Sequence, residues 1–228
     1  MKFCFVIEDI SGEKMLRRLI PRLAPIAKGD YTIRSYQGIG SIPEKTTMAA
    51  AFEAAEKEND ILFQVEKEKT LLDDLRRLLS AYVDAYKGQE YVAVVICDLD
   101  YRKRDEFEQK LKAIVDSCPQ KPNAVFCLAI EEGEAWLLGD IPAIKKAYPA
   151  AVDSVLSSYT NDEICGTWEK LADAIYPGGS AVLSTKTSEE IGKVKSKWAE
   201  KIAPNMDVDK NKSPSFCNFR DTVRKLAQ

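Results

Sequence analysis

The chain has 228 residues, a hydrophobic fraction of 45% and a formal net charge of −3. These values are typical of a globular unit of ordinary size, are too apolar for a disordered chain, and do not favour a generic nucleic-acid coat. The sequence contains no histidine, which excludes Ser-His-Asp triads, Cys-His pairs and histidine-based zinc sites.

Short apolar runs alternate with helical periodicity through residue 130. A strand that is apolar on both faces is typical of a central parallel strand, and residues 91–97 have this pattern. Ser11 is a candidate N-cap for the first helix. The predicted strands are 3–7, 31–36, 91–97 and 124–130, and the predicted helices are 12–23, 46–58, 66–86 and 104–115.

After Asp140 the strand signal fades. Residues 181–183 are a candidate short strand, although the run is too brief to decide, and Ser213 with Pro214 predicts a helix start. The predicted helices are 142–148, 167–175, 188–202 and 215–226. We therefore expect an α/β core over residues 1–140, with a largely parallel sheet, and a mainly helical C-terminal extension over 141–228 packed on it.

The same patterns predict where the protein resides. No apolar run reaches the ~18–20 residues that span a bilayer. The first residues lack the basic region and the small-residue cleavage site of a signal peptide. We therefore expect a cytoplasmic protein with no membrane partner.

Acidic residues follow three of the predicted strands. Glu8 and Asp9 follow the first strand, Asp98 and Asp100 follow the central strand, and the cluster that contains Glu134 follows the last one. Ligand sites in parallel sheets form at the carboxyl ends of strands, and residues two apart on an extended strand point the same way. Clustered carboxylates favour Mg²⁺ or Mn²⁺. The alternative is that these residues cap helices and remain in water.

The acidic pattern resembles the toprim arrangement of topoisomerases, bacterial primases, OLD-family nucleases and recombination-repair proteins. The chain more closely resembles a toprim-like bacterial family, the domain-of-unknown-function 4276 family. Four segments carry this resemblance: Val6-Ile7-Glu8 with Glu13, the run from Val94 to Asp100, the Glu131–Asp140 string that contains Glu-Ala-Trp-Leu-Leu, and Asn211-Lys212-Ser213-Pro214-Ser215-Phe216. Asp9 stands where the family usually has glycine.

The resemblance implies a toprim-like, Rossmann-like fold and a role for each acidic residue. Glu8 would be the catalytic glutamate, either a metal ligand or a general acid/base. Asp98 and Asp100 would hold Mg²⁺ or Mn²⁺, and Glu134 would be the additional catalytic acid.

Two further groups of residues are candidates for substrate binding. Gly38 and Gly40 lie in a glycine-rich loop whose N–H groups could cradle a phosphate, although a turn is the simpler interpretation. Arg102, Lys103 and Arg104 directly follow the paired aspartates and could neutralise phosphates, or could start a solvated helix. The lysines between residues 186 and 201 are better explained as a solvated helix face than as a nucleic-acid strip.

These residues and the resemblance support three hypotheses. The first is a Mg²⁺-dependent phosphodiester hydrolase acting on DNA or RNA in a defence or mobile-element system. The chain has no P-loop motif, so an ATPase would be a separate partner. The second is a non-catalytic regulatory subunit that keeps the acidic site, and the third is a transferase acting on a small nucleotide.

Overall fold

A computed structural model describes residues 1–40, 70–130, 132–163 and 166–228. Its centre is a parallel sheet of four strands in the order β2-β1-β3-β4, which confirms the predicted α/β class. The strands are β1 (Lys2–Ile7), β2 (Tyr31–Ser35), β3 (Tyr91–Asp98) and β4 (Ala124–Ala129).

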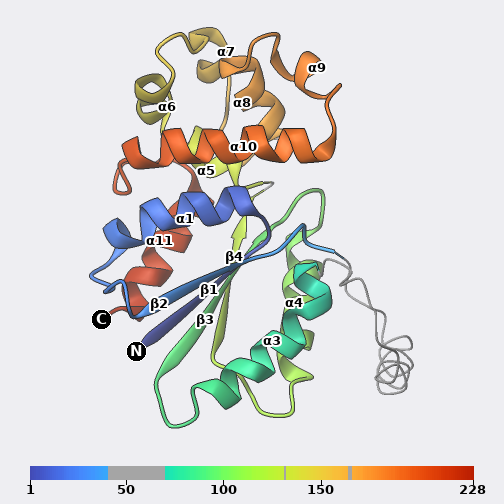
Figure 1. Cartoon of the computed structure of the whole chain (residues 1–228), viewed down its shortest axis with the longest axis vertical. Coiled ribbons are helices and arrows are strands. Elements are labelled where there is room, and N and C mark those ends of the chain that lie inside the picture. Colours follow the sequence, from blue (N-terminus) through green and yellow to red (C-terminus); the bar gives the residue numbers. More distant parts are fainter. Residues whose placement is uncertain (41–69, 131, 164–165) are drawn as a thin grey trace.

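Helices flank the sheet and make up the C-terminal region (Figure 1). Across the described residues, every helix is too short or too polar to span a lipid bilayer. The helices are α1 (Ile10–Leu23), α3 (Leu71–Ala85), α4 (Arg104–Asp116), α5 (Glu134–Leu138), α6 (Ile141–Ala147), α7 (Asp153–Ser157), α8 (Thr167–Ile175), α9 (Gly179–Leu183), α10 (Ser188–Ile202) and α11 (Pro214–Leu226), with a 3₁₀ turn at Ala203–Asn205.

The central strand β3 is buried on both faces because alternate side chains enter two different cores. Val94 and Ile96 join the core that also contains side chains of α1, α10 and α11. Val95 and Cys97 join a second core, which α3 and α4 complete. Figure 1 shows these two helical layers on opposite sides of the sheet. This two-sided burial explains why β3 is an almost unbroken apolar run.

The C-terminal helices contribute to the first of these cores. Helix α10 lies along α1, and α11 packs against β4 (Figure 1). The fully buried Trp136 from α5 stacks on Phe219 of α11, with ring centroids 4.8 Å apart. Residues on both sides of position 140 therefore share one continuous hydrophobic core.

Several local predictions need correction or fall outside the described residues. The candidate strand at 181–183 is wrong, because these residues end the short helix α9. The N-cap of α1 is Asp9, not Ser11: the Asp9 side chain accepts a hydrogen bond of 2.7 Å from the Gly12 N–H. The helix predicted at 46–58 lies outside the described residues, as does the start of the one predicted at 66–86.

Candidate carboxylate site

Glu8 and Asp98 meet at the carboxyl end of the sheet. Strands β1 and β3 are adjacent and in parallel register, with Ile7 opposite Ile96, so the residues that follow them emerge together. The Glu8 Oε2 atom accepts a hydrogen bond of 3.1 Å from the backbone N–H of Asp98. The Glu8 side chain therefore lies against the backbone at the end of β3.

Burial and mutual repulsion make these carboxyl groups hard to ionise. Burial, with the charges of Asp100 and Asp9, raises the pKa of Glu8 to about 7, although the hydrogen bond from Asp98 N–H opposes this rise. Burial and the neighbouring Glu8 and Asp9 also raise the pKa of Asp98 well above its ordinary value. The site therefore concentrates negative charge that water solvates poorly.

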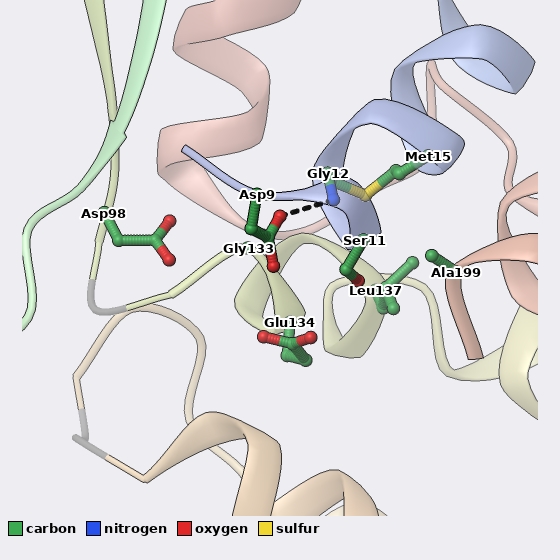
Figure 2. Close-up of a pocket in the computed structure, with 9 residues that line it drawn as sticks. All are labelled: Asp9, Ser11, Gly12, Met15, Asp98, Gly133, Glu134, Leu137 and Ala199. Carbon is green, nitrogen blue, oxygen red and sulfur yellow. Dashed lines mark hydrogen bonds between the residues drawn. The ribbon is translucent and has the colours of Figure 1, made fainter. Parts of the chain in front are cut away.

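Asp98 also lines a small pocket, whose lining does not include Glu8 or Asp100. Figure 2 shows the Asp98 carboxylate directed toward Asp9, with the Glu134 carboxylate near them. The first turn of α1 closes one side, so the same Asp9 that caps this helix also lines the pocket. The lining residues are Asp9, Ser11, Gly12, Met15, Asp98, Gly133, Glu134, Leu137 and Ala199. Three carboxylates from three segments therefore share one pocket.

Glu134 begins α5 and forms an ion pair with Lys195, a residue of the lysine-rich segment that was expected to be a solvated helix face. Its Oε2 atom lies 3.1 Å from the Lys195 Nζ, and the two side chains are 3% and 16% exposed. Burial raises the pKa of Glu134 to about 7, although Lys195 lowers it. Lys195 lies four and seven residues before the buried Ala199 and Ile202, so it is on the buried face of α10. This helical spacing could have identified Lys195 from the sequence as a buried lysine.

Asp100 does not lie on the strand with Asp98. Strand β3 ends at Asp98, and Asp100 occupies the following turn with a φ of 48°. An Asp tolerates this left-handed conformation better than most residues. Its carboxylate forms an ion pair with Arg102, yet its charge still contributes to the raised pKa of Glu8. The extended-strand geometry expected for this pair is therefore wrong at Asp100, which approaches the site from the turn.

Residues 7–224 match the family described as "Domain of unknown function (DUF4276)". The chain belongs to this DUF4276 family. No curated protein and no solved structure matches the chain.

The two most specific strings of the DUF4276 resemblance contact each other. The Asn211 side chain donates to the Trp136 carbonyl at 2.8 Å and accepts from the Ser213 N–H at 2.9 Å. The indole N–H of Trp136 donates to Ser215 Oγ at 3.0 Å. Ser213 caps α11 by accepting from the Phe216 N–H, which confirms the predicted helix start. These strings hold α5, and with it Glu134, against α11.

The basic residues after the paired aspartates have different surroundings. Arg102 pairs with Asp100 and lies over the Phe107 ring, 5.3 Å from its centroid. Lys103 and Arg104 are exposed and form ion pairs with acidic residues one turn along α4. A role of Arg102, Lys103 and Arg104 in binding phosphates stays a prediction. Of these three residues, Arg102 is the one whose positive charge lowers the pKa of Glu8.

Gly38 and Gly40 both have positive φ, at 97° and 72°, which explains glycine at these positions. The Gly38 N–H donates to the Glu8 carbonyl at 3.0 Å, so the loop lies beside the end of β1. A Cβ at Gly40 would lie 1.8 Å from Thr70 Oγ1. The turn accounts for both glycines, and phosphate binding by their loop stays a prediction.

The donors of this DUF4276 site suit a hard divalent cation by their chemistry. They are carboxylate oxygens with excess negative charge, which Mg²⁺ and Mn²⁺ prefer. Within the described ranges, no three acidic, histidine or cysteine side chains are arranged to hold a metal ion together. The resemblance names Glu8, Asp98 and Asp100 as the residues that would hold such an ion, and the Asp100–Arg102 ion pair would have to open for them to do so. Glu131 lies outside the described residues.

Proposed function

We propose that this protein is a Mg²⁺- or Mn²⁺-dependent phosphodiester hydrolase that acts on nucleic acid. The observation that carries the proposal is the meeting of Glu8 and Asp98 at the carboxyl end of adjacent parallel strands, with the pKa of both carboxyl groups raised. Perturbed carboxyl groups beside a pocket are typical of sites that bind cations or transfer protons.

Each acidic residue has a proposed part in this reaction. Asp98 and Asp100 would hold the cation together with Glu8, and the cation would supply charge stabilisation at a phosphoryl oxygen. If Glu8 acts as a general acid/base instead of as a ligand, its pKa of about 7 suits it to take up or release a proton near neutral pH. Glu134, with a pKa raised to the same value, is the second candidate for proton transfer.

The substrate and partners follow from the toprim resemblance of the sequence. The resemblance favours DNA or RNA as the substrate, in a defence or mobile-element setting with a separate ATPase as partner. Arg102 supports a phosphate substrate, because it brings a guanidinium group beside the carboxylates.

A nuclease assay tests this proposal. We expect wild-type protein to cleave DNA or RNA with Mg²⁺ or Mn²⁺, alone or with a neighbouring ATPase, and Asp98→Asn to lose at least 100-fold of that activity. Asp105→Asn is the matched control, because Asp105 is an exposed acid in α4. Equal cleavage by wild type and Asp98→Asn would refute the mechanism.

A non-catalytic regulatory subunit is the second candidate function. It is favoured by the two ion pairs at the site, Asp100 with Arg102 and Glu134 with Lys195, which already neutralise part of the negative charge. In that case the protein would bind Mn²⁺ or a partner without cleaving any nucleic acid. Metal binding with no turnover under all of the assay conditions would favour this candidate over the hydrolase.

A further inference from the structure

Tyr101 projects into water from the turn that follows β3. It is 86% exposed, whereas the other exposed large apolar residues in the described part of the chain are 45% or 50% exposed. A tyrosine ring usually packs its apolar body against the protein and leaves only its hydroxyl group wet. A ring that lies almost wholly in water is therefore a feature that packing does not explain.

The turn that carries Tyr101 is anchored on both sides. The Arg102 N–H donates to the Leu99 carbonyl at 3.1 Å, and Leu99 is buried in the core that α3 and α4 complete. The Arg102 guanidinium group pairs with Asp100 and lies over the ring of the buried Phe107. The exposure of Tyr101 is therefore built into an ordered turn.

This turn borders the carboxylate site. Asp98 ends β3, and its N–H donates to Glu8 at the end of the adjacent strand. Asp100 and Arg102, on either side of Tyr101, both act on the pKa of Glu8 through their charges. A ligand that contacts Tyr101 therefore lies against the turn next to these acids.

The basic residues that follow Tyr101 have exchangeable partners. The Lys103 and Arg104 side chains are 80% and 57% exposed. Their ion pairs with Glu106 and Glu108 are on the surface of α4, and exposed pairs of this kind contribute little to stability. A phosphate oxygen can replace the glutamate in either pair. An aromatic ring and two accessible cations thus follow one another in the chain.

We propose that Tyr101 is a stacking platform for an unpaired base, and that Lys103 and Arg104 contact the phosphates that flank it. The substrate of the hydrolase is then a single-stranded stretch of nucleic acid. This inference rests on the proposed function and specifies the form of nucleic acid that the site takes.

The physical reason is the accessibility of the base face. In a duplex each base is stacked between its neighbours, so an aromatic side chain reaches a base face only where the strand is unpaired. The net charge of −3 gives no general attraction for a duplex, which a protein binds mainly through its phosphates. Stacking supplies affinity that this charge does not.

Fluorescence anisotropy with labelled oligonucleotides tests the inference in EDTA, where a metal-dependent hydrolase leaves the strand intact. We expect wild type to bind an oligothymidine strand more tightly than a duplex of the same length. Tyr101→Ala should weaken strand binding by about fivefold or more, as expected for the loss of one stacked base. Tyr101→Trp should keep the affinity, and the control Val182→Ala, an exposed apolar residue of α9, should not change it.

A strand with abasic sites in place of its bases separates stacking from charge. Wild type and Tyr101→Ala should bind this strand equally. Lys103→Met with Arg104→Met should weaken the binding of both strands and reduce its salt dependence. Lys28→Met with Lys87→Met is the matched control, because these exposed lysines precede β2 and β3 at the opposite edge of the sheet.

The remaining outcomes separate this inference from the proposed function. Equal binding of oligothymidine by wild type and Tyr101→Ala would overturn the inference, as would an equal affinity of wild type for strand and duplex. A loss of the same size on the abasic strand would also overturn it, because stacking needs a base. If wild type binds no single strand, the inference fails, and duplex cleavage that depends on Asp98 would leave the hydrolase standing.

Discussion

At the scale of single residues, the site is governed by repulsion among partly buried acids. Glu8 accepts from the backbone of Asp98, and the carboxylates of Asp9 and Asp100 add negative charge nearby. We expect this arrangement to lower the stability of the metal-free fold, because the unfolded chain solvates the same groups in water. Functional sites commonly carry such a cost.

Removal of one of these charges is therefore expected to stabilise the metal-free protein. At pH 8, Asp98→Asn should raise the melting temperature by about 2–4 °C, which corresponds to about 1 kcal/mol for a chain of this size. Mg²⁺ should raise the melting temperature of wild type but not that of Asp98→Asn, since ligand binding stabilises only the competent fold. Scanning fluorimetry with and without Mg²⁺ measures both effects, and a destabilised Asp98→Asn would contradict the repulsion.

The pH dependence of stability follows from the raised pKa of Glu8. Between its ordinary pKa of 4.5 and its folded value of about 7, the folded state keeps a proton that the unfolded state has lost. The free energy of unfolding of the metal-free protein should therefore fall as pH rises through this window, by about 1–3 kcal/mol. Urea unfolding at pH 5 and pH 7.5 measures the fall. In Glu8→Gln the free energy of unfolding should fall less between these two pH values. An equal fall in both proteins would show that Glu8 is not the source of the pH dependence.

At the scale of elements, the contact between α5 and α11 positions Glu134. Asn211 is 5% exposed, and its side chain bridges the Trp136 carbonyl and the Ser213 N–H. A Cβ at Gly139 would lie 2.1 Å from the Asn211 Oδ1, so the close approach of this side chain also requires glycine there. This bridge gives a structural reason for both family strings.

Loss of the bridge should therefore cost stability. Asn211→Ala leaves two buried backbone groups without these partners, and we expect a loss of about 2–4 kcal/mol in the free energy of unfolding. Urea unfolding measures it. The exposed neighbour Lys212→Ala is the control and should change stability by less than about 0.5 kcal/mol. A change of that small size in Asn211→Ala would show that the bridge contributes little.

At the scale of the whole molecule, the C-terminal helices complete both the core and the site. Trp136 stacks on Phe219, α10 covers α1, and Lys195 reaches Glu134 from α10. The C-terminal region therefore completes the first hydrophobic core, and it supplies the Lys195 ammonium group that pairs with Glu134.

A chain that ends at residue 140 is accordingly expected not to fold cooperatively. It would expose the apolar face of α1 and of the sheet that α10 and α11 cover in the whole chain. We expect strong binding of a hydrophobic dye and no sharp thermal transition by circular dichroism. Co-expression with residues 141–228 is the complementary arm and should restore the transition. A cooperative transition in the short chain would mean that the core closes without the C-terminal helices.

The sequence by itself determined the α/β class, the four strands that the structure describes and the acidic residues that follow three of them. These features depend on local sequence. A parallel strand that is buried on both faces has a continuous apolar run, and this run can be recognised in the sequence, as in β3. The strand-end position of Glu8 and Asp98 followed from the same pattern, and their contact follows from the adjacency of β1 and β3.

Only the tertiary structure decided which groups pair with these acids. The pairing of Glu134 with Lys195 joins residues 61 positions apart, and it depends on how α10 packs on α1. The turn that moves Asp100 off the strand depends on a left-handed backbone conformation that no periodic pattern encodes. The periodicity of apolar residues indicates which positions are buried. The partner of a buried charge, in contrast, depends on packing between segments that are distant in the sequence.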